Sequence, residues 1–493
     1  MKEVKVDVAI LGAGIVGIWL AHLLAKRGHT VGIVEVGGDR RSERKVAIPQ
    51  IVFPNRRNEG AVRARNQVLT GNSRYWGGGI IRNDSDQLQV MFRESCDPEF
   101  LNQMRRAYGA VEATLGVAPA ERHRIEGHEE WLLAEVCILT GKRRNVAEAM
   151  LPGLMANAKA HVCCNASITK IEYSAENLVS AIEFVDAKHG VVRFVSQRYV
   201  LAMGVVDTNL FVQKHLMRTF RQDLQVVGTR LHDHWSVPIA RCKWRKPFPD
   251  DWLFPIEFRG GHIVRKRVEL AVSCPWGTQF GFTHVQARYG EIEPYATLKM
   301  LLEARQEGKS VAEVVSRGAR LARHWPALIK VVLERWNNKR LYVAEGVELE
   351  VVLDFESFPH RENRIELRND NAYLYWDIRD EDVDIFAKLV RKVLPLIEEW
   401  AKQYGLRFEL LAGSLGRSGL FDYLNSRSVD AFHLGGGLSS WGDAGVWSWG
   451  AGVQGQGNRN LAVIGTAAFR RPGIASPVET LLAMCNIYAA SVL

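Results

Sequence analysis

The N-terminal segment combines a buried strand, a glycine-rich turn and a helix, and it restricts the possible folds more than any other part of the chain. The apolar run at residues 4–11 predicts a strand covered on both faces, as in a parallel sheet. The sequence GAGIVG at residues 12–17 follows and opens a predicted helix over residues 15–28. A second strand is predicted over residues 30–36. This order predicts the first βαβ unit of a doubly wound α/β domain.

Five residues of this unit have properties that a dinucleotide site requires. Gly12 permits the tight turn after the strand, Gly14 lets the backbone approach a pyrophosphate, and Gly17 lets the helix pack closely on the strand. Ile15 begins the helix, whose free N–H groups favour a phosphate. Glu35 can accept hydrogen bonds from ribose hydroxyls. The unit predicts a bound dinucleotide and leaves FAD and NAD open, although its N-terminal position favours FAD.

The length and composition fit a globular protein of more than one domain. The chain has 493 residues, of which 47% are hydrophobic and 24% are charged. Its formal net charge of +9 suits anionic ligands, or it simply maintains solubility. The sequence contains no long block of like charges and no nucleic-acid-binding motif. Nucleic acid is therefore not an expected partner.

Cysteine usage and targeting patterns favour a cytoplasmic protein. The 7 cysteines include no C-x-x-C pair, so we expect neither a disulfide framework nor a metal site. A glycine loop interrupts the N-terminal apolar run, which argues against a signal peptide. No stretch reaches the ~18 apolar residues of a transmembrane helix. We expect a soluble protein, with peripheral membrane contact as the less favoured alternative.

The rest of the chain contains a second structural pattern. Residues 39–66 are rich in basic and turn-forming residues and are expected to form a loop. After residue 235 the apolar residues alternate more weakly, as at 262–272, which predicts a separate antiparallel sheet. The sequence becomes glycine-rich again after residue 413. Further predicted elements are helices at 98–115, 381–404 and 478–493, and strands at 166–173, 179–185, 198–202 and 461–465.

Several later segments, taken in order, carry the motifs of one enzyme family. They are TGNSRYWGGG at 70–79, YVLAMGVVD at 199–207, VGTRLHDH at 227–234, NRIEL at 363–367 with Trp376-Asp377, NLAVIGTAAF at 460–469 and SPVET at 476–480. Each motif is degenerate, but their order along the chain makes the match specific. The sequence resembles the glucose–methanol–choline (GMC) family of FAD-dependent oxidoreductases over most of its length.

The resemblance implies that the dinucleotide is FAD and that two domains interleave along the chain. The implied fold class is α/β, with a Rossmann-like FAD-binding domain interleaved with an antiparallel-sheet substrate domain, the GMC oxidoreductase fold. The FAD-binding domain would comprise residues 1–95, residues 96–240 with a helical insertion, and residues 413–493 with the active-site residues. Residues 241–412 would form the substrate domain, whose sheet covers the flavin.

The resemblance also implies which residues bind FAD. Beyond the N-terminal unit, they are Asn72, Ser73, Tyr75, Trp76, Gly77, Ile168, Ala202, Gly204, Gly465, Thr466 and Pro477. Several members of the family attach FAD covalently through a histidine just before the tryptophan of the second glycine segment. Tyr75 stands at that position, so we expect non-covalent FAD.

Two residues are implied to carry the chemistry. Alcohol oxidation needs a group that takes the hydroxyl proton while hydride leaves the carbon for flavin N5, and a neutral histidine suits this task. His433, in the segment AFHLGGG, stands at the position of the family's catalytic histidine. Ser476 stands where the family has a second histidine or an asparagine. Serine can donate a hydrogen bond but is not a base at neutral pH without activation, which leaves a single-base mechanism or altered chemistry open.

Other polar and aromatic residues receive weaker assignments. The spacing of His232, Asp233 and His234 gives little support for a metal site or a triad, and the resemblance makes them structural. A cluster of tryptophans close to His433 in sequence suits the flat faces of a sugar, glycoside or polyol, with packing between the domains as the alternative. These tryptophans are Trp441, Trp447 and Trp449.

Three functions remain open from the sequence. The first is an FAD-dependent oxidase or dehydrogenase acting on a sugar-like alcohol, with oxygen or another carrier as the electron acceptor. The second is a non-redox lyase or epimerase on the same fold, and the third is a flavin-binding partner subunit. A basic stretch at residues 299–340 could rest on an acidic membrane, although a solvated helix pair is favoured.

Overall fold

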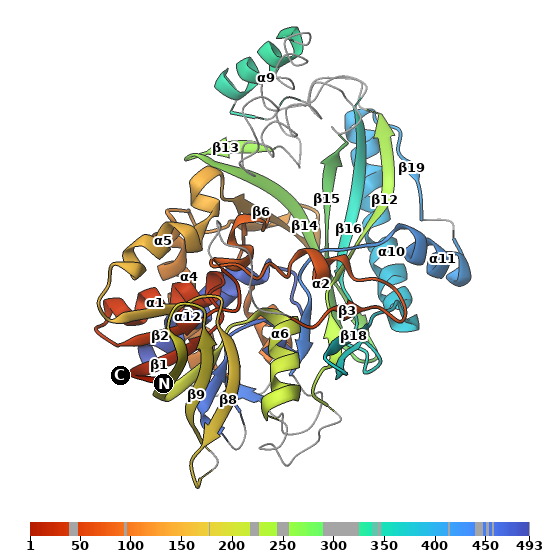
Figure 1. Cartoon of the computed structure of the whole chain (residues 1–493). Coiled ribbons are helices and arrows are strands. Elements are labelled where there is room, and N and C mark those ends of the chain that lie inside the picture. The colour runs from red at the N-terminus through yellow and green to blue at the C-terminus, as the bar shows by residue number, and fades with distance from the viewer. Residues whose placement is uncertain are drawn as a thin grey trace.

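Two large sheets and their helices form the molecule, one at the lower left and the other at the upper right of Figure 1. Both chain termini lie at the lower left, beside the first sheet. The computed structural model describes residues 1–38, 48–92, 96–176, 178–216, 226–243, 256–288, 325–337, 339–340, 342, 347–412, 415–438, 447–449, 453–455 and 458–492.

The first sheet contains the N-terminal unit at its centre. Among the described residues, its strands in spatial order are β22 (Trp447–Trp449), β23 (Val453–Gly455), β24 (Asn458–Val463), β10 (Gly190–Leu201), β1 (Lys2–Leu11), β2 (Val31–Val34) and β7 (Ala160–Cys163). The central pairs from β24 to β7 are parallel, and the hairpin of β8 (Ser167–Tyr173) and β9 (Val179–Asp186) joins β10 antiparallel. The predicted doubly wound domain is confirmed.

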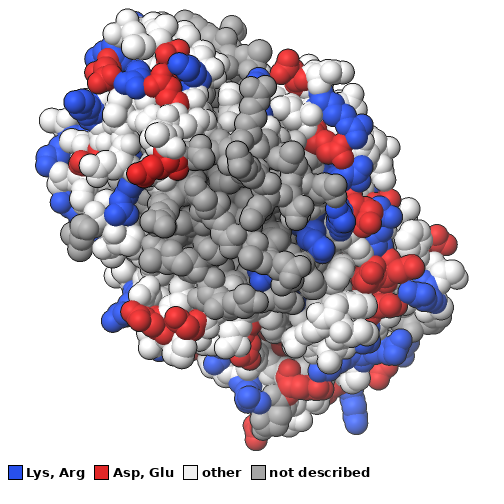
Figure 2. Space-filling view, turned by 90° about the horizontal axis from the view of Figure 1, so that it is seen from below, with Lys and Arg blue, Asp and Glu red and all other residues white. Residues whose placement is uncertain are grey.

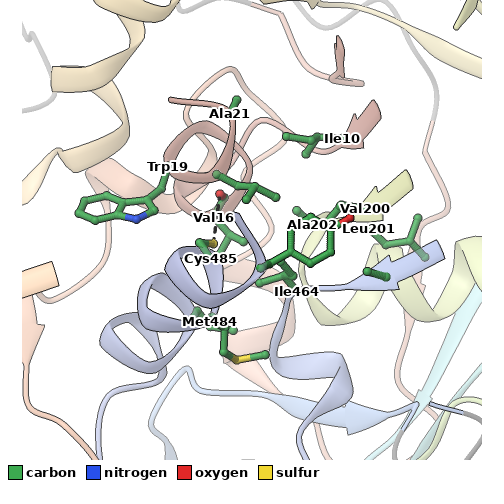
Figure 3. Close-up of a cluster of buried hydrophobic side chains, with 14 of the residues drawn as sticks. Ile10, Val16, Trp19, Ala21, Val200, Leu201, Ala202, Ile464, Met484 and Cys485 are labelled. Carbon is green, nitrogen blue, oxygen red and sulfur yellow. Dashed lines mark hydrogen bonds between the residues drawn. The ribbon is translucent and has the colours of Figure 1, made fainter. Parts of the chain in front are cut away.

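The core of this domain lies between the parallel strands and two helices from opposite ends of the chain. α1 (Ile15–Lys26) follows the glycine turn, and α12 (Pro477–Ser491) packs against it. Figure 3 shows Val16 of α1 beside Cys485 of α12, with Ile10 of β1 at the upper right of the same cluster. Burial of these side chains fixes the C-terminal helix on the N-terminal unit, because apolar area removed from water stabilises the fold at about 25 cal/mol per Å².

The second sheet is antiparallel in every pair between described strands. Its main path is β19 (Glu409–Leu410), β12 (His234–Lys243), β16 (Glu348–Glu356), β15 (Gly277–Ala287), β14 (His262–Cys274), β6 (His128–Ile138) and β4 (Gly79–Ile80). Shorter strands flank this path: β13 (Glu257–Arg259), β20 (Val429–Asp430) and β5 (Arg122–Ile125). The long helix α10 (Asp380–Tyr404) packs its apolar side on β14 and β15.

Smaller elements connect the two sheets. β11 (Thr229–His232) pairs with β21 (Gly435–Gly437), and β17 (Arg364–Arg368), β18 (Asn371–Tyr375) and β3 (Ile51–Val52) form a third small sheet. The other described α-helices are α2 (Glu59–Arg63), α3 (Ser85–Phe92), α4 (Pro98–Leu115), α5 (Val146–Met155), α6 (Gly204–Phe211), α9 (Trp325–Asn337) and α11 (Arg417–Arg427).

The structure differs from the sequence-based expectation in two respects. The expected loop at residues 39–66 contains β3 and α2, whose N-cap Asn58 accepts a hydrogen bond from the Ala61 N–H. Residues 1–95, 96–240 and 413–493 are expected within the FAD-binding domain, but they contribute β4, β5, β6, β12 and β20 to the antiparallel sheet. The physical reason is that β14 needs a partner on both edges, and β6 supplies the one opposite β15.

The basic stretch at residues 299–340 lies largely outside the described residues, and only α9 and a few residues after it are described. Within the described ranges, every helix is too short or too polar to cross a membrane.

A buried carboxyl group lies in the first turn of α12. Glu479 is fully buried, and burial together with the neighbouring Glu112 raises the pKa of Glu479 to about 8. The helix N-terminus favours a negative charge there, but the loss of hydration outweighs that effect. Between an ordinary carboxyl pKa and about 8, the folded protein therefore holds a proton that the unfolded chain has released.

We predict that Glu479→Gln makes the protein less sensitive to alkaline pH. The wild type loses stability as the pH rises through this range, because the unfolded chain binds fewer protons than the folded protein. The variant should be about 1–3 kcal/mol more stable than the wild type at pH 9, with a smaller difference at pH 5. Thermal unfolding across pH measures this, with Glu99→Gln, an exposed first-turn glutamate of α4, as the matched control. Parallel pH profiles for the wild type and Glu479→Gln would show that the group is not responsible.

Candidate functional site

A cavity of about 1890 Å³ lies between the two sheets. One wall is formed at the carboxyl ends of parallel strands, by Gly12, Glu35, Ala202 and Ile464. Strands β14 and β15 of the antiparallel sheet contribute the opposite wall. The carboxyl ends of parallel strands are where open α/β sheets bind ligands, and the volume is large enough for a dinucleotide together with a substrate.

The glycine turn has the close packing that its sequence predicts. Gly12 has φ of 104°, and a Cβ atom there would lie 2.5 Å from the carbonyl oxygen of Ala202. A Cβ atom on Gly17 would overlap the carbonyl oxygen of Gly12. Gly14 differs from both, because a Cβ atom there would meet no protein atom and Gly14 lines the cavity. Gly12 and Gly17 are thus required by the fold, whereas Gly14 leaves space for a ligand.

Glu35 supports this turn from the end of β2. Its carboxylate oxygens accept hydrogen bonds of 2.8 Å from the backbone N–H groups of Ala13 and Gly37. Burial raises the pKa of Glu35, and the two hydrogen bonds oppose that change. The side chain therefore fixes the glycine turn and at the same time borders the cavity, where a ribose would lie in the expected arrangement.

Most of the cofactor residues predicted from the sequence meet at this cavity. Those that line it are Gly12, Gly14, Ile15, Glu35, Asn72, Tyr75, Trp76, Gly77, Ile168, Ala202, Gly204, Gly465, Thr466 and Pro477. Two further predicted residues, Gly17 and Ser73, do not line it. Gly17 supports the turn from behind, and the Ser73 hydroxyl accepts a hydrogen bond from the Ala147 N–H at the start of α5.

The second glycine segment presents an exposed tyrosine and an anchored tryptophan to the cavity. Tyr75 is 61% exposed, while the Trp76 indole donates a 2.6 Å hydrogen bond to the Arg144 carbonyl oxygen. The Asn72 side chain bonds to Asn66 and to the Ala64 carbonyl oxygen, which holds the segment against α2.

His433 lines the cavity and contacts a second buried histidine. Its Nδ1 atom lies 3.2 Å from Nδ1 of His234, and Nε2 of His234 is hydrogen-bonded to the Gly473 carbonyl oxygen. Burial lowers the pKa of His433 to about 4 and that of His234 to about 3, so both rings are neutral at pH 7.

These contacts determine where the protons lie on the two rings. A neutral imidazole carries one N–H, and His234 must use it as the donor to Gly473. Nδ1 of His234 is then an acceptor, so Nδ1 of His433 carries the proton between them. Nε2 of His433 is left unprotonated and has no hydrogen-bond partner among the described residues. His433 therefore presents a proton acceptor, as a general base requires.

Asp233 holds both histidines in place through the backbone. Its Oδ1 atom accepts the N–H groups of His234 at 2.7 Å and His433 at 2.9 Å. Burial raises the pKa of Asp233 to about 8, an effect increased by Asp430. His232 points elsewhere and bonds to the Phe469 carbonyl oxygen at 2.9 Å. The sequence predicted only a structural role for residues 232–234 and did not predict the contact between His234 and His433.

Ser476 also lines the cavity, at the N-cap of α12. Its hydroxyl makes no hydrogen bond to any described group, including the N–H groups of its own helix. It is therefore available to a ligand. The sequence-predicted tryptophan cluster cannot be placed in the same way: Trp441 and the side chains of Trp447 and Trp449 lie outside the described residues.

Three further lining residues carry no sequence motif. Arg267, Phe282 and His284 project from β14 and β15, and Nδ1 of His284 lies 3.1 Å from the buried Asp354 carboxylate. Among described residues, no group of three or more His, Cys, Asp or Glu side chains is arranged to hold a metal ion.

Comparison with known proteins identifies the fold. No family model and no curated protein matches the sequence. Among solved structures, the chain is similar to pyridoxine 4-oxidase from Mesorbium loti, with 13% identity, a TM-score of 0.58 and coverage of 98% of each chain. It is also similar to a formate oxidase variant from Aspergillus oryzae RIB40, with 13% identity, a TM-score of 0.56 and coverage of 100% of this chain and 98% of that one. This chain has the GMC oxidoreductase fold.

We predict that substitution by alanine has different effects at Gly14 and at Gly17, the second and third glycines of the turn. Gly14→Ala should leave the thermal midpoint of ligand-free protein unchanged, since its methyl group meets no protein atom, but weaken FAD binding by about tenfold or more. Gly17→Ala should lower that midpoint, at a cost of about 1–3 kcal/mol, because its methyl group overlaps Gly12. Thermal unfolding and FAD titration measure the two effects. Wild-type FAD affinity in Gly14→Ala would rule out close approach of a pyrophosphate at this turn.

Proposed function

We propose that this chain is an FAD-dependent oxidoreductase that oxidises a primary or secondary alcohol. The observation that carries the proposal is that one cavity joins the dinucleotide turn at Gly12–Gly17 to an unprotonated histidine nitrogen on His433. The similar solved structures are oxidases, and FAD is named for one of them, which supports the proposal. A sugar, glycoside or polyol is the proposed alcohol, and oxygen or another carrier is the acceptor.

The residues of the cavity fit FAD. Glu35 can accept from the ribose hydroxyls, and the N-terminus of α1 offers its N–H groups to the pyrophosphate, since no side chain caps it. Gly14 leaves the space that a close approach requires. When bound, FAD supplies the hydride acceptor of the reaction. We propose that it is held without a covalent bond, because Tyr75 stands where a histidine would make one.

His433 would take the hydroxyl proton on Nε2. Its Nδ1–H is held by His234, so the ring cannot present the wrong nitrogen to the substrate. The low pKa keeps the ring neutral at pH 7, and Nε2 takes the proton from the hydroxyl oxygen as hydride leaves the carbon that carries this hydroxyl. Ser476 would donate a hydrogen bond to the substrate oxygen and position it. This arrangement has a single base.

We predict that the His433→Ala variant retains FAD. The substrate should reduce this FAD on the order of 10²- to 10⁴-fold more slowly than it reduces FAD in the wild type. The substrate is first found by anaerobic bleaching with a panel of sugars, glycosides and polyols, and the rate is then measured by stopped flow. Wild-type activity should also fall as the pH drops towards the His433 pKa of about 4, where the base becomes protonated.

A matched control separates loss of the base from loss of a buried histidine. His232 is fully buried and bonded to a backbone carbonyl oxygen, as His234 is, but it does not contact the His433 ring. His232→Gln should destabilise the protein while leaving the reduction rate near the wild-type value. Near-normal reduction in His433→Ala would remove its role as the base.

A further inference from the structure

We infer that the alcohol substrate carries an oxoanion group, a carboxylate or a phosphate, which binds to Arg267 of β14. This inference rests on the proposed function, because it names the substrate class of the same site. It narrows the sugar or polyol to one that also bears a negative charge.

The cavity wall that β14 and β15 of the antiparallel sheet contribute is basic. Three consecutive cationic residues of β14 line it: Arg265, Lys266 and Arg267. The carboxylates that line the cavity, among described residues, are Glu35 and Asp207, and neither comes from the antiparallel sheet. Glu35 bonds to the glycine turn, and Asp207 is paired with Arg65 at 2.5 Å. These two carboxylates are therefore not available to neutralise the positive charges of the β14 side chains.

The face shown in Figure 2 has no continuous basic patch among its described residues. On the face shown in Figure 2, the described basic and acidic side chains are intermixed. The basic wall inside the cavity is not a continuation of a basic area on that face. A charge concentrated inside a cleft acts on the ligand in the cleft, because low-dielectric walls screen it less than water does.

Arg267 has hydrogen-bonding capacity left for a ligand. Its side chain is only 6% exposed, and its Nε and Nη2 atoms bond to Oε1 of Glu269 at 3.0 and 2.5 Å. The guanidinium lies 4.0 Å from the ring centre of Phe282, which also lines the cavity. Nη1 has no acceptor among the described residues, so its two N–H groups can donate to a ligand in the cavity.

The ion pair with Glu269 is part of a larger group of charges. The Glu269 carboxylate also accepts a 2.9 Å hydrogen bond from Nε of Arg122, so two guanidinium groups share this carboxylate. Asp354, the next buried carboxylate, attracts the Arg267 charge and lies 3.1 Å from Nδ1 of His284. Neither carboxylate accepts a hydrogen bond from Nη1 of Arg267. An oxoanion on the ligand would accept from Nη1, and charge-assisted bonds of this kind are the strong ones.

The anion site lies within reach of the proposed chemistry. Burial sets the low pKa of His433, while the charge of Asp354 raises that pKa and the charge of Arg267 lowers it further. Ser476 and His433 line the same cavity as Arg267. A substrate bound by its oxoanion to Arg267 can therefore extend its hydroxyl group to His433.

Acetate and inorganic phosphate are the probes that test the site. The FAD-loaded protein is titrated with each at constant ionic strength set by chloride, and both the flavin absorption and the thermal midpoint are followed. We expect saturable binding of at least one probe, weakened about tenfold or more in Arg267→Gln and less in Arg267→Lys. The probe that binds more tightly identifies the group as a carboxylate or a phosphate.

Matched variants make the result decisive. Arg241→Gln removes an arginine of β12 that pairs with Glu409 at the surface of the same sheet, and it should bind the probes as the wild type does. Arg267→Lys keeps a positive charge at the same position but loses the geometry of the guanidinium, so it should bind the probes more weakly than the wild type even if Arg267→Gln fails to fold. The inference is overturned if neither probe binds saturably to the wild type, or if Arg267→Gln and Arg267→Lys both bind as tightly as the wild type.

The outcome is separable from that of the proposed function. If FAD is bound and a neutral alcohol reduces it in a His433-dependent way while neither anion binds, only the substrate class is wrong. If the anions bind at Arg267 but the protein holds no FAD, the proposed oxidoreductase activity is wrong.

Discussion

The close contact between Gly17 of α1 and Gly12 at the end of β1 is the constraint on which the rest of the structure depends. It brings the helix N-terminus directly behind the carboxyl ends of the parallel strands, because neither residue has a side chain to separate them. The same contact places α1 where α12 can pack on it, and the final motif of the chain thereby reaches the cavity. The cofactor turn and Ser476 are thus positioned by one packing interaction.

A second constraint joins the two domains at the proposed base. The Asp233 carboxylate accepts N–H groups from β12 and from the segment that carries His433, residues that lie far apart in sequence. The backbone of Asp233 also exchanges hydrogen bonds with Ser357, at the end of β16. The position of His433 is therefore set by the antiparallel sheet, and its protonation state by a histidine of that sheet. In the proposed function, the substrate site and the orientation of the base would then depend on the same structural unit.

The sequence predicted the parts of the fold that depend on local chemistry. The strand, turn and helix at residues 4–28 follow from apolar runs and glycines, and helix 98–115 has an Asp97 N-cap and a Gly116 C-cap that are visible in the sequence. Pairings between distant segments were not predictable. β6 lies in the antiparallel sheet because β14 needs a partner, which neither segment shows alone.

Only part of the site could be predicted, because contacts between segments that are distant in sequence cannot be inferred from either segment alone. Motifs placed Gly14, Glu35 and His433 at one cavity, but the contact between His234 and His433 depends on how two loops meet in space. Arg267 belongs to an ordinary alternating strand, and only its burial and its shared carboxylate distinguish it.

The central claim is that this cavity holds FAD, and the content of the purified protein tests it most directly. The protein is precipitated with acid, and the supernatant and pellet are examined by absorption spectroscopy and mass spectrometry. The account predicts a flavin spectrum before precipitation and FAD in the supernatant. Flavin retained in the pellet would contradict non-covalent binding, and a protein that contains no flavin and takes up none from added FAD would contradict the claim itself.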